Sequence, residues 1–368
     1  MKQELEHVTV HADGTAAPRI EWVDHAKGLC IIMVVAMHST LGIEARLPEG
    51  AGLEGGDTGW MGWLVAFAAP FRMPDFFLIA GLFLARTIER DWRTYLDRKV
   101  VHFVYFYVLW VTIQFAFKGV PIALEEGPGA ALAAYLVAFV EPFGTLWFIY
   151  MLPIFFLVAR LAREMGLPHW AMLTAGVALE IAPIDTGTLL VDEFASRFVY
   201  FYAGYALAPL VFGLADWFAS RKVVGIGVLA LWAVTNGALV ATGWSMVPGL
   251  SLALGAAGAV AVVAFGVLLS AAGGTDWLRW LGAHSIVVYL AFFLPMIVVR
   301  EVLMRLPSHV PFAPVEPATW ALLTTTAAVA GPVILFWIVR RSGLGRFLFE
   351  RPAWARTDRE RAMRHVVA

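Results

Sequence analysis

Long apolar runs separated by short polar segments fill the chain between residues 28 and 341. A helix that crosses a bilayer needs about 20 mostly apolar residues, and ten runs have roughly this length. The pattern therefore predicts an all-α fold, a polytopic integral membrane helix bundle with about ten transmembrane helices. The expected spans are 28–46, 59–86, 99–119, 145–161, 169–184, 194–213, 222–242, 249–272, 284–304 and 319–341.

Two parts of the pattern depart from a plain span. The second run contains Pro70 and Pro74, which predict a kink. An eleventh apolar stretch, 129–140, is only about a dozen residues long, and that length does not cross a bilayer. We expect this stretch to be interfacial or re-entrant.

Positive charges predict the orientation of the bundle. With the N-terminus in the cytoplasm, most of the 27 Lys and Arg fall in inner segments, while Arg46, Lys118 and Arg305 stay in outer loops. The positive-inside rule favours this arrangement. Both termini are then cytoplasmic. The expected divisions are a cytoplasmic N-terminal segment 1–27, a membrane domain 28–341 and a basic cytoplasmic tail 342–368. The tail either contacts anionic lipids or acts only as a topology anchor.

Composition excludes several other classes of protein. The chain is 60% hydrophobic and 15% charged, whereas soluble domains are about 25% charged. A net charge of -1 provides no basic field for nucleic acid. The single cysteine excludes a disulfide framework, and the nine histidines have no spacing typical of a metal site. We therefore expect neither nucleic acid nor a metal as a ligand.

The first predicted span carries a histidine near mid-membrane. Ionisable groups at this depth are costly and indicate function by default. His38 follows Lys27 by eleven residues, about three helical turns, so both side chains are expected on one helix face. Histidine suits proton transfer near neutral pH. The alternative is a packing histidine, with Lys27 as a flanking anchor.

The second predicted span carries an acid and a base around a proline. Arg72 and Asp75 are three residues apart, a spacing at which they could pair on a helix and so lower the cost of burying both. Pro74 leaves a backbone carbonyl one turn back without its helical partner. These features predict a polar-lined segment that faces a cavity. The alternative is a structural ion pair between two helices.

Clusters of arginine flank the predicted spans. The inner loop after the second span carries Arg86, Arg90, Arg93, Arg98 and Lys99. Arginine matches phosphate oxygens well, which indicates a phosphorylated cofactor, although these residues alternatively form a plain topology signal. A second charged cluster is expected near the outer surface. Its side chains either line a site for a polar or anionic acceptor or extend to the membrane interface. Its members are Arg197, Arg300 and Glu301.

Four sequence blocks in order resemble the membrane acyltransferase-3 family of bacterial inner-membrane acyltransferases. The first runs from Glu21 to Ser39. The family's motif in this block is a basic residue, ten intervening residues and a histidine, and Lys27 and His38 match it. The second runs from Arg72 to Gly81. The third and fourth are Gly144-Thr145-Leu146-Trp147-Phe148 and 281–290. Asp75 and Ala80 stand where the family usually has an apolar residue and a serine.

This resemblance implies O-acylation of a hydroxyl compound. The donor would be acyl-CoA, with acetyl-CoA or a succinyl donor expected, and the acceptor an envelope glycan or a hydroxyl-bearing lipid in the bacterial inner membrane. His38 would act as general base or transient acyl carrier, with Arg72 and Asp75 as further catalytic candidates. The CoA phosphates would be held by Lys27, Arg93, Arg98 and Lys99. Membrane lipids are further expected partners, and a homo-oligomer is compatible with the sequence.

Two other classes of protein fit the same residues. A proton-coupled transporter or flippase of a polar envelope compound would also use a midplane histidine and a broken, charged helix, although no inverted repeat is visible. A non-catalytic partner in an envelope assembly would need neither His38 nor Lys27. Acyl-CoA dependence separates the enzyme from both alternatives.

Overall fold

The computed structural model describes residues 20–47, 59–142, 144–305 and 316–357. Within these ranges every regular element is a helix, which confirms the all-α prediction. Most of the expected N-terminal segment, at 1–19, and the end of the tail, at 358–368, lie outside the described residues.

Seven helical segments are long and apolar enough to cross a membrane. They contain α1 (Glu21–Glu44), α2 (Gly59–Leu82), α3 and α4 (Trp92–Leu96 and His102–Glu125), α6 (Trp147–Glu164), α10 (Lys222–Ala241), α11 (Leu250–Ala272) and α15 (Pro317–Ser342). Helix α2 continues through both Pro70 and Pro74.

Two further predicted spans are broken helices. Helices α8 (Leu189–Ala206) and α9 (Ala208–Ser220) meet at 73°, and α13 (Ser285–Ala291) and α14 (Phe293–Arg305) meet at 52°. Helix α7 (His169–Ile181) has 13 residues, about 20 Å, and is short for a bilayer core of about 30 Å. The described residues thus provide seven spans, or up to nine with the bent pairs, and the expected count of ten is not confirmed.

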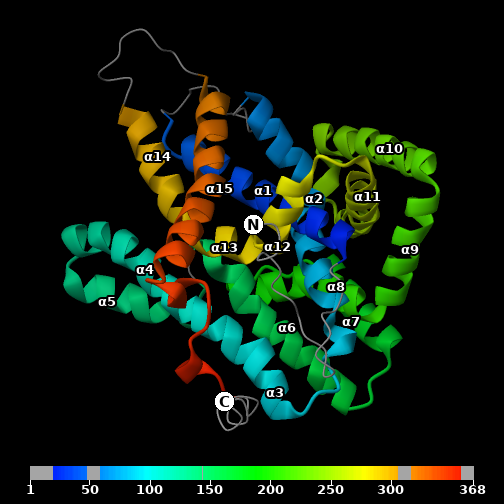
Figure 1. The fold of residues 1–368 in the computed structure, drawn as a ribbon, viewed down its shortest axis with the longest axis horizontal. Helices are drawn as coiled ribbons and strands as arrows, with labels where there is room; N and C mark the ends of the chain where they lie inside the picture. The colour runs from blue at the N-terminus through cyan, green and yellow to red at the C-terminus, as the bar shows by residue number, and fades with distance from the viewer. Residues whose placement is uncertain (1–19, 48–58, 143, 306–315, 358–368) are drawn as a thin grey trace.

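The extra apolar stretch forms the short helix α5 (Pro128–Val137), which lies beside α4 at one edge of the molecule (Figure 1). The Tyr135 and Thr112 hydroxyls are 2.7 Å apart and join the two helices. Ten residues extend only about 15 Å, so α5 does not cross a bilayer.

Helix α1 is central and contacts α2, α11, α15 and the short helix α12 (Asp276–Ala283). Glycines permit two very close helix contacts. A Cβ on Gly282 of α12 would lie 1.7 Å from the Asp24 carbonyl oxygen of α1. A Cβ on Gly204 of α8 would lie 2.0 Å from the Leu78 carbonyl oxygen of α2. Since Gly282 belongs to the fourth sequence block, that block fixes α12 against the first.

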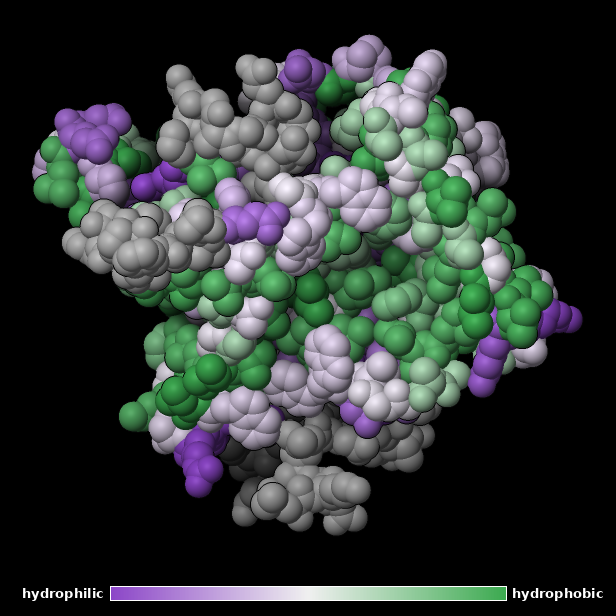
Figure 2. All heavy atoms as spheres, turned by 90° about the horizontal axis from the view of Figure 1, so that it is seen from above, coloured by the Kyte–Doolittle hydropathy of each residue, from purple (hydrophilic) through white to green (hydrophobic). Residues whose placement is uncertain are grey.

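The outside of the bundle is rich in apolar side chains. Figure 2 shows them across much of one face, with hydrophilic residues mainly toward its margins. Large exposed apolar side chains include Trp63 at 51% and Leu231 at 71% of full exposure. A soluble monomer seldom exposes apolar surface so extensively. With the long apolar helices, this surface identifies a multi-pass membrane protein.

The start of the tail packs against the segment between α3 and α4. The buried Asp97 carboxylate accepts hydrogen bonds from Arg351 and from the backbone N–H of Thr357 at 2.6 Å. The Arg351 guanidinium also donates to the Asp97 carbonyl oxygen at 2.9 Å. Nearby, Arg93 donates to the Thr357 carbonyl oxygen at 2.8 Å. Residues 351–357 therefore pack against the bundle through hydrogen bonds to Asp97 and Arg93.

Candidate active site

Two cavities meet inside the bundle beside α1. The larger, here called the His38 cavity, has a volume of about 340 Å³. The smaller, called the Lys27 cavity, has a volume of about 230 Å³. Phe76, Phe148 and Tyr289 line both of them. The two cavities therefore adjoin at these three aromatic rings.

Helix α1 brings one titratable side chain to each cavity. Lys27 and His38 are eleven residues apart, about 16 Å along the helix axis, and lie on the same face. The His38 ring lies 5.4 Å from the Phe292 ring, centroid to centroid. Within the described part of the chain, neither ring nitrogen of His38 makes a hydrogen bond. The imidazole is therefore available to a ligand in the cavity, as a general base requires.

Arg72 lines the His38 cavity from α2. One of its terminal nitrogens donates to the Val65 carbonyl oxygen at a long 3.4 Å, and its Nε is buried without a partner among the described residues. A guanidinium has five N–H donors and keeps its charge, so this side chain retains donors for an anionic group. Its place suits stabilisation of negative charge next to His38.

Helix α8 contributes Leu189, Glu193 and Arg197 to the lining of the His38 cavity. Glu193 and Arg197 form an ion pair at 2.9 Å, and their side chains are 26% and 28% exposed. Glu141 fixes the start of this helix, because its carboxylate accepts a hydrogen bond from the Leu189 N–H at 2.8 Å. Helix α8 therefore provides a carboxylate and a guanidinium that a polar ligand in the cavity could contact.

Tyr289 fixes the turn that leads into α6. Its hydroxyl donates to the Thr145 carbonyl oxygen at 2.6 Å and accepts from the Phe148 N–H at 3.2 Å. Thr145 also donates to the buried Gln114 amide oxygen at 3.3 Å. The third and fourth sequence blocks thus meet in space at these bonds. Together they shape one wall of the His38 cavity.

The Lys27 cavity is mainly apolar. Apart from Lys27, Ser285 and Tyr289, its lining consists of Phe76, Ile79, Ala80, Phe103, Phe148, Ile149, Leu152 and Ile286. The Lys27 ammonium is 3.8 Å from the Asp24 carboxylate and 5.9 Å from the Phe83 ring centroid. Arg86 approaches the same ring, with its guanidinium carbon 5.4 Å from the centroid. Two cations therefore lie near Phe83.

The remaining expected cofactor residues are farther from this cavity. Arg93 is bonded to the tail, and Arg98 is exposed at the surface. Lys99 lies 4.4 Å above the Phe156 ring, which stacks with Phe103 of the cavity wall at 5.9 Å. Among the residues expected to bind the cofactor, only Lys27 lines a cavity described here.

The predicted pairing of Arg72 with Asp75 is absent from the described structure. Asp75 is 1% exposed, and neither of its carboxylate oxygens has a hydrogen-bond partner among the described residues. Asp75 lines neither cavity. Three residues along a helix turn the side chain about 60° away from Arg72, and here this rotation directs the two groups to different surroundings.

Several cavity residues are absent from the sequence-based site. These are Glu193, Thr145 and Trp147, which line the His38 cavity. Of these, Thr145 and Trp147 lie within a recognised sequence block. Glu193 lies one residue before the expected sixth span, 194–213, and four residues before Arg197, a spacing that indicates a possible ion pair on a helix.

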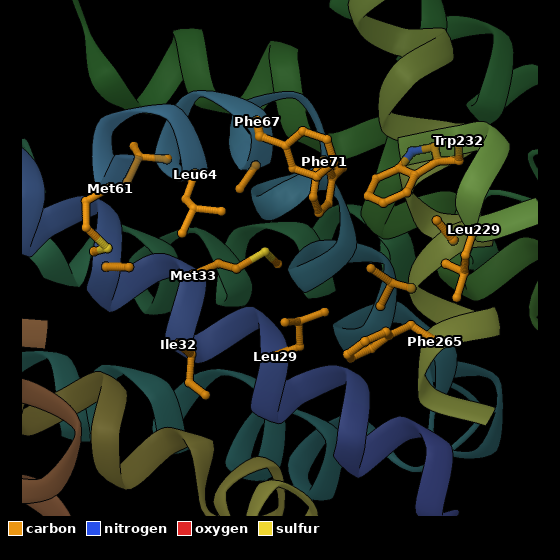
Figure 3. A pocket seen from close by; sticks show the side chains of 15 residues that line it. Leu29, Ile32, Met33, Met61, Leu64, Phe67, Phe71, Leu229, Trp232 and Phe265 are labelled. Atoms are coloured by element: carbon orange, nitrogen blue, oxygen red, sulfur yellow. The ribbon is translucent and has the colours of Figure 1, made fainter. Parts of the chain in front are cut away.

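A third cavity, of about 310 Å³, lies on another side of α1 and α2 (Figure 3). Leu29 and Met33 line it from α1, Phe67 and Phe71 from α2, and Trp232 from α10. It contains no charged side chain and so offers no acid, base or anion-binding group. Among the described residues, no group of three or more His, Cys, Asp or Glu could hold a metal ion.

Comparison with known proteins assigns the family. The model of a family described as "Acyltransferase domain" matches residues 20–337. The chain belongs to this acyltransferase family. Both cavities and all four sequence blocks lie within the matched residues, which supports acyl transfer as the general activity.

A curated relative is the inner membrane protein YcfT of Escherichia coli (strain K12), with 27% identity over 177 residues. The match covers 44% of this chain and 49% of the relative, so the chain spans about half the length of the curated relative that it matches. No solved structure matches the chain.

Proposed function

We propose that this protein is a bacterial inner-membrane O-acyltransferase. It moves a short acyl group, acetyl or succinyl, from acyl-CoA to a hydroxyl of an envelope glycan or hydroxyl-bearing lipid. The observation that carries the proposal is the pair of adjoining cavities on one face of α1, one holding Lys27 and the other His38. Family membership supports acyl transfer in general.

The donor enters the Lys27 cavity from the cytoplasmic side. Lys27 and Arg86, which both approach Phe83, provide positive charge for the CoA phosphates. The apolar lining suits the flexible arm that carries the thioester toward the three shared rings. In this arrangement Arg86, together with Lys27, contacts the CoA phosphates. Arg93, Arg98 and Lys99, which were expected there from the sequence, do not.

The acceptor hydroxyl lies in the His38 cavity. His38 takes its proton as the hydroxyl oxygen attacks the thioester carbonyl carbon. The Arg72 guanidinium stabilises the resulting oxyanion in a site of low dielectric. The carbon–sulfur bond then breaks, the new ester forms, and the imidazolium returns its proton to the departing thiolate. Holding both reactants in adjoining cavities provides the proximity that the reaction needs.

The test uses inverted membrane vesicles from cells that express the full chain, supplied with radiolabelled acetyl-CoA or succinyl-CoA. Label that enters the glycan or lipid fraction is the readout. Wild type should transfer label, and His38→Ala should reduce transfer by about 10²-fold or more, in line with loss of a general base. His169→Ala is the matched control, because His169 lies outside both cavities and contacts Tyr202 at 3.1 Å. Full activity in a correctly inserted His38→Ala protein would refute the mechanism.

The transporter hypothesis makes a different prediction about acyl-CoA consumption in the same vesicles. A flippase or transporter would move its compound without consuming acyl-CoA, and release of free CoA thiol would not depend on the protein. Thiol release that requires His38 therefore separates the two functions.

A further inference from the structure

Three aromatic rings stand between the Lys27 cavity and the His38 cavity. Phe76 comes from α2, Phe148 from the first turn of α6 and Tyr289 from α13. The Phe76 and Phe148 ring centroids are 4.9 Å apart at an interplanar angle of 83°, and those of Phe148 and Tyr289 are 5.7 Å apart at 65°. These spacings are typical of aromatic rings in van der Waals contact. The three rings, called here the aromatic partition, therefore form a continuous row of contacts at the junction of the two cavities.

The members of the partition differ in how firmly they are held. Tyr289 is 5% exposed, and its hydroxyl makes two hydrogen bonds with the backbone of 145–148. Phe148 is 6% exposed, and its ring also packs against Phe77 at 4.6 Å. Phe76 is only half-buried. Its ring has no polar anchor, so it is the member that can rotate at the lowest cost.

Phe76 also lies next to the proposed chemistry. It follows Arg72 by four residues, so the two side chains lie on one face of α2, and both line the His38 cavity. Under the proposed function, a thioester that approaches from the Lys27 cavity reaches the acceptor across the junction of the two cavities, which Phe76, Phe148 and Tyr289 line. The acyl substituent must then occupy space beside the Phe76 ring.

We propose that the aromatic partition selects the acyl group by size and that Phe76 is its adjustable, specificity-determining residue. This inference rests on the proposed function. The three rings are in contact, so rotation of Phe76 opens only enough space for a small acyl group. A long acyl chain would also have to displace Phe148 or Tyr289, which are buried and held by their neighbours. The partition also keeps water in one cavity from the thioester in the other until an acceptor is bound.

The first test compares donors of increasing chain length. Transfer from acetyl-CoA, butyryl-CoA and octanoyl-CoA is measured for wild type, Phe76→Ala and Phe76→Trp in the same vesicles. Wild type should prefer acetyl. Phe76→Ala should raise the ratio of octanoyl to acetyl transfer by about tenfold or more, and Phe76→Trp should reduce acetyl transfer. Phe67→Ala is the matched control, because this half-buried phenylalanine of the same helix lines the third cavity instead.

The second test needs no turnover. Cys30 is the sole cysteine, so a Cys30→Ser background carrying Met37→Cys places one thiol in the wall of the His38 cavity. A membrane-impermeant thiol reagent should label it from one face of oriented vesicles only. Adding Phe76→Ala should permit labelling from both faces, and Phe67→Ala should not.

The outcomes of the two tests are distinct. One-sided labelling that Phe76→Ala makes two-sided supports the partition even if no acyl transfer is found, in which case the proposed function fails alone. Active protein whose chain-length ratio is unchanged in a folded Phe76→Ala variant overturns the size selection while the proposed function stands. Labelling of Met37→Cys from both faces with Phe76 intact overturns the partition itself.

Discussion

The contact between α12 and α1 should not tolerate even one added methyl group. A Cβ on Gly282 would lie 1.7 Å from the Asp24 carbonyl oxygen and 2.6 Å from the Gly28 nitrogen, whereas ordinary contacts begin at 3.4 Å. Both obstacles are backbone atoms, which cannot rotate away. Relief therefore requires α12 to move from α1 by more than an ångström. Overpacking costs about 1–3 kcal/mol, and we expect Gly282→Ala to reach or exceed the upper end.

The matched control is Gly227→Ala in α10, where an added Cβ meets no atom within 4 Å. Alanine is favoured over glycine in a helix by about 0.5–1 kcal/mol, so this variant should be more stable. Thermal unfolding in detergent is followed with a thiol-reactive fluorophore, since Cys30 is the only cysteine and is fully buried. A Gly282→Ala protein that unfolds at or above the wild-type temperature would refute the reasoning, as would equal shifts in both variants.

Three further substitutions test the site and the tail. Arg72→Gln should lower kcat about 10²–10³-fold at unchanged protein yield, because a preorganised hydrogen-bond donor to the oxyanion is lost. An unchanged rate of acyl transfer in the vesicle assay would show that Arg72 does not act in the mechanism. Asp75→Asn should keep transfer within a few-fold of wild type, since Asp75 lines neither cavity, and a 10²-fold loss would contradict this. Arg351→Ala should destabilise the fold by about 3–5 kcal/mol, because it leaves the buried Asp97 without its charged partner; the thiol-reactivity assay measures this loss.

Much of the fold follows from hydropathy alone, since each apolar run of about 20 residues forms a helix. The exceptions are the three expected spans at 169–184, 194–213 and 284–304. There the helices are short or bent, and Ala206 to Ala208 and Ala291 to Phe293 mark the two breaks. Window hydropathy cannot detect such breaks, because the residues at a bend remain apolar. They depend on packing against neighbouring helices.

The candidate site was predictable where it depended on one helix. The helical repeat of about 3.6 residues, applied to the eleven-residue spacing, correctly places Lys27 and His38 on one face of α1. Each of the two side chains lines a cavity. The same reasoning was wrong for the pairing of Arg72 and Asp75, because local spacing allows a contact without requiring it. The position of Arg93 against the tail involves residues 264 positions apart, and no local pattern contains that information.

The linings of the two cavities bear on the choice between enzyme and transporter. A transporter of a polar compound needs polar or charged groups along the whole route, as at the midplane sites of such proteins. Here Arg72, Glu193 and Arg197 line the His38 cavity, Lys27 is the one charged residue in the lining of the Lys27 cavity, and the residues that line both cavities are three aromatic ones. A polar acceptor would be stabilised on one side of these rings and a mainly apolar thioester arm on the other. This division favours two reactants that meet at the junction over one polar cargo that crosses it.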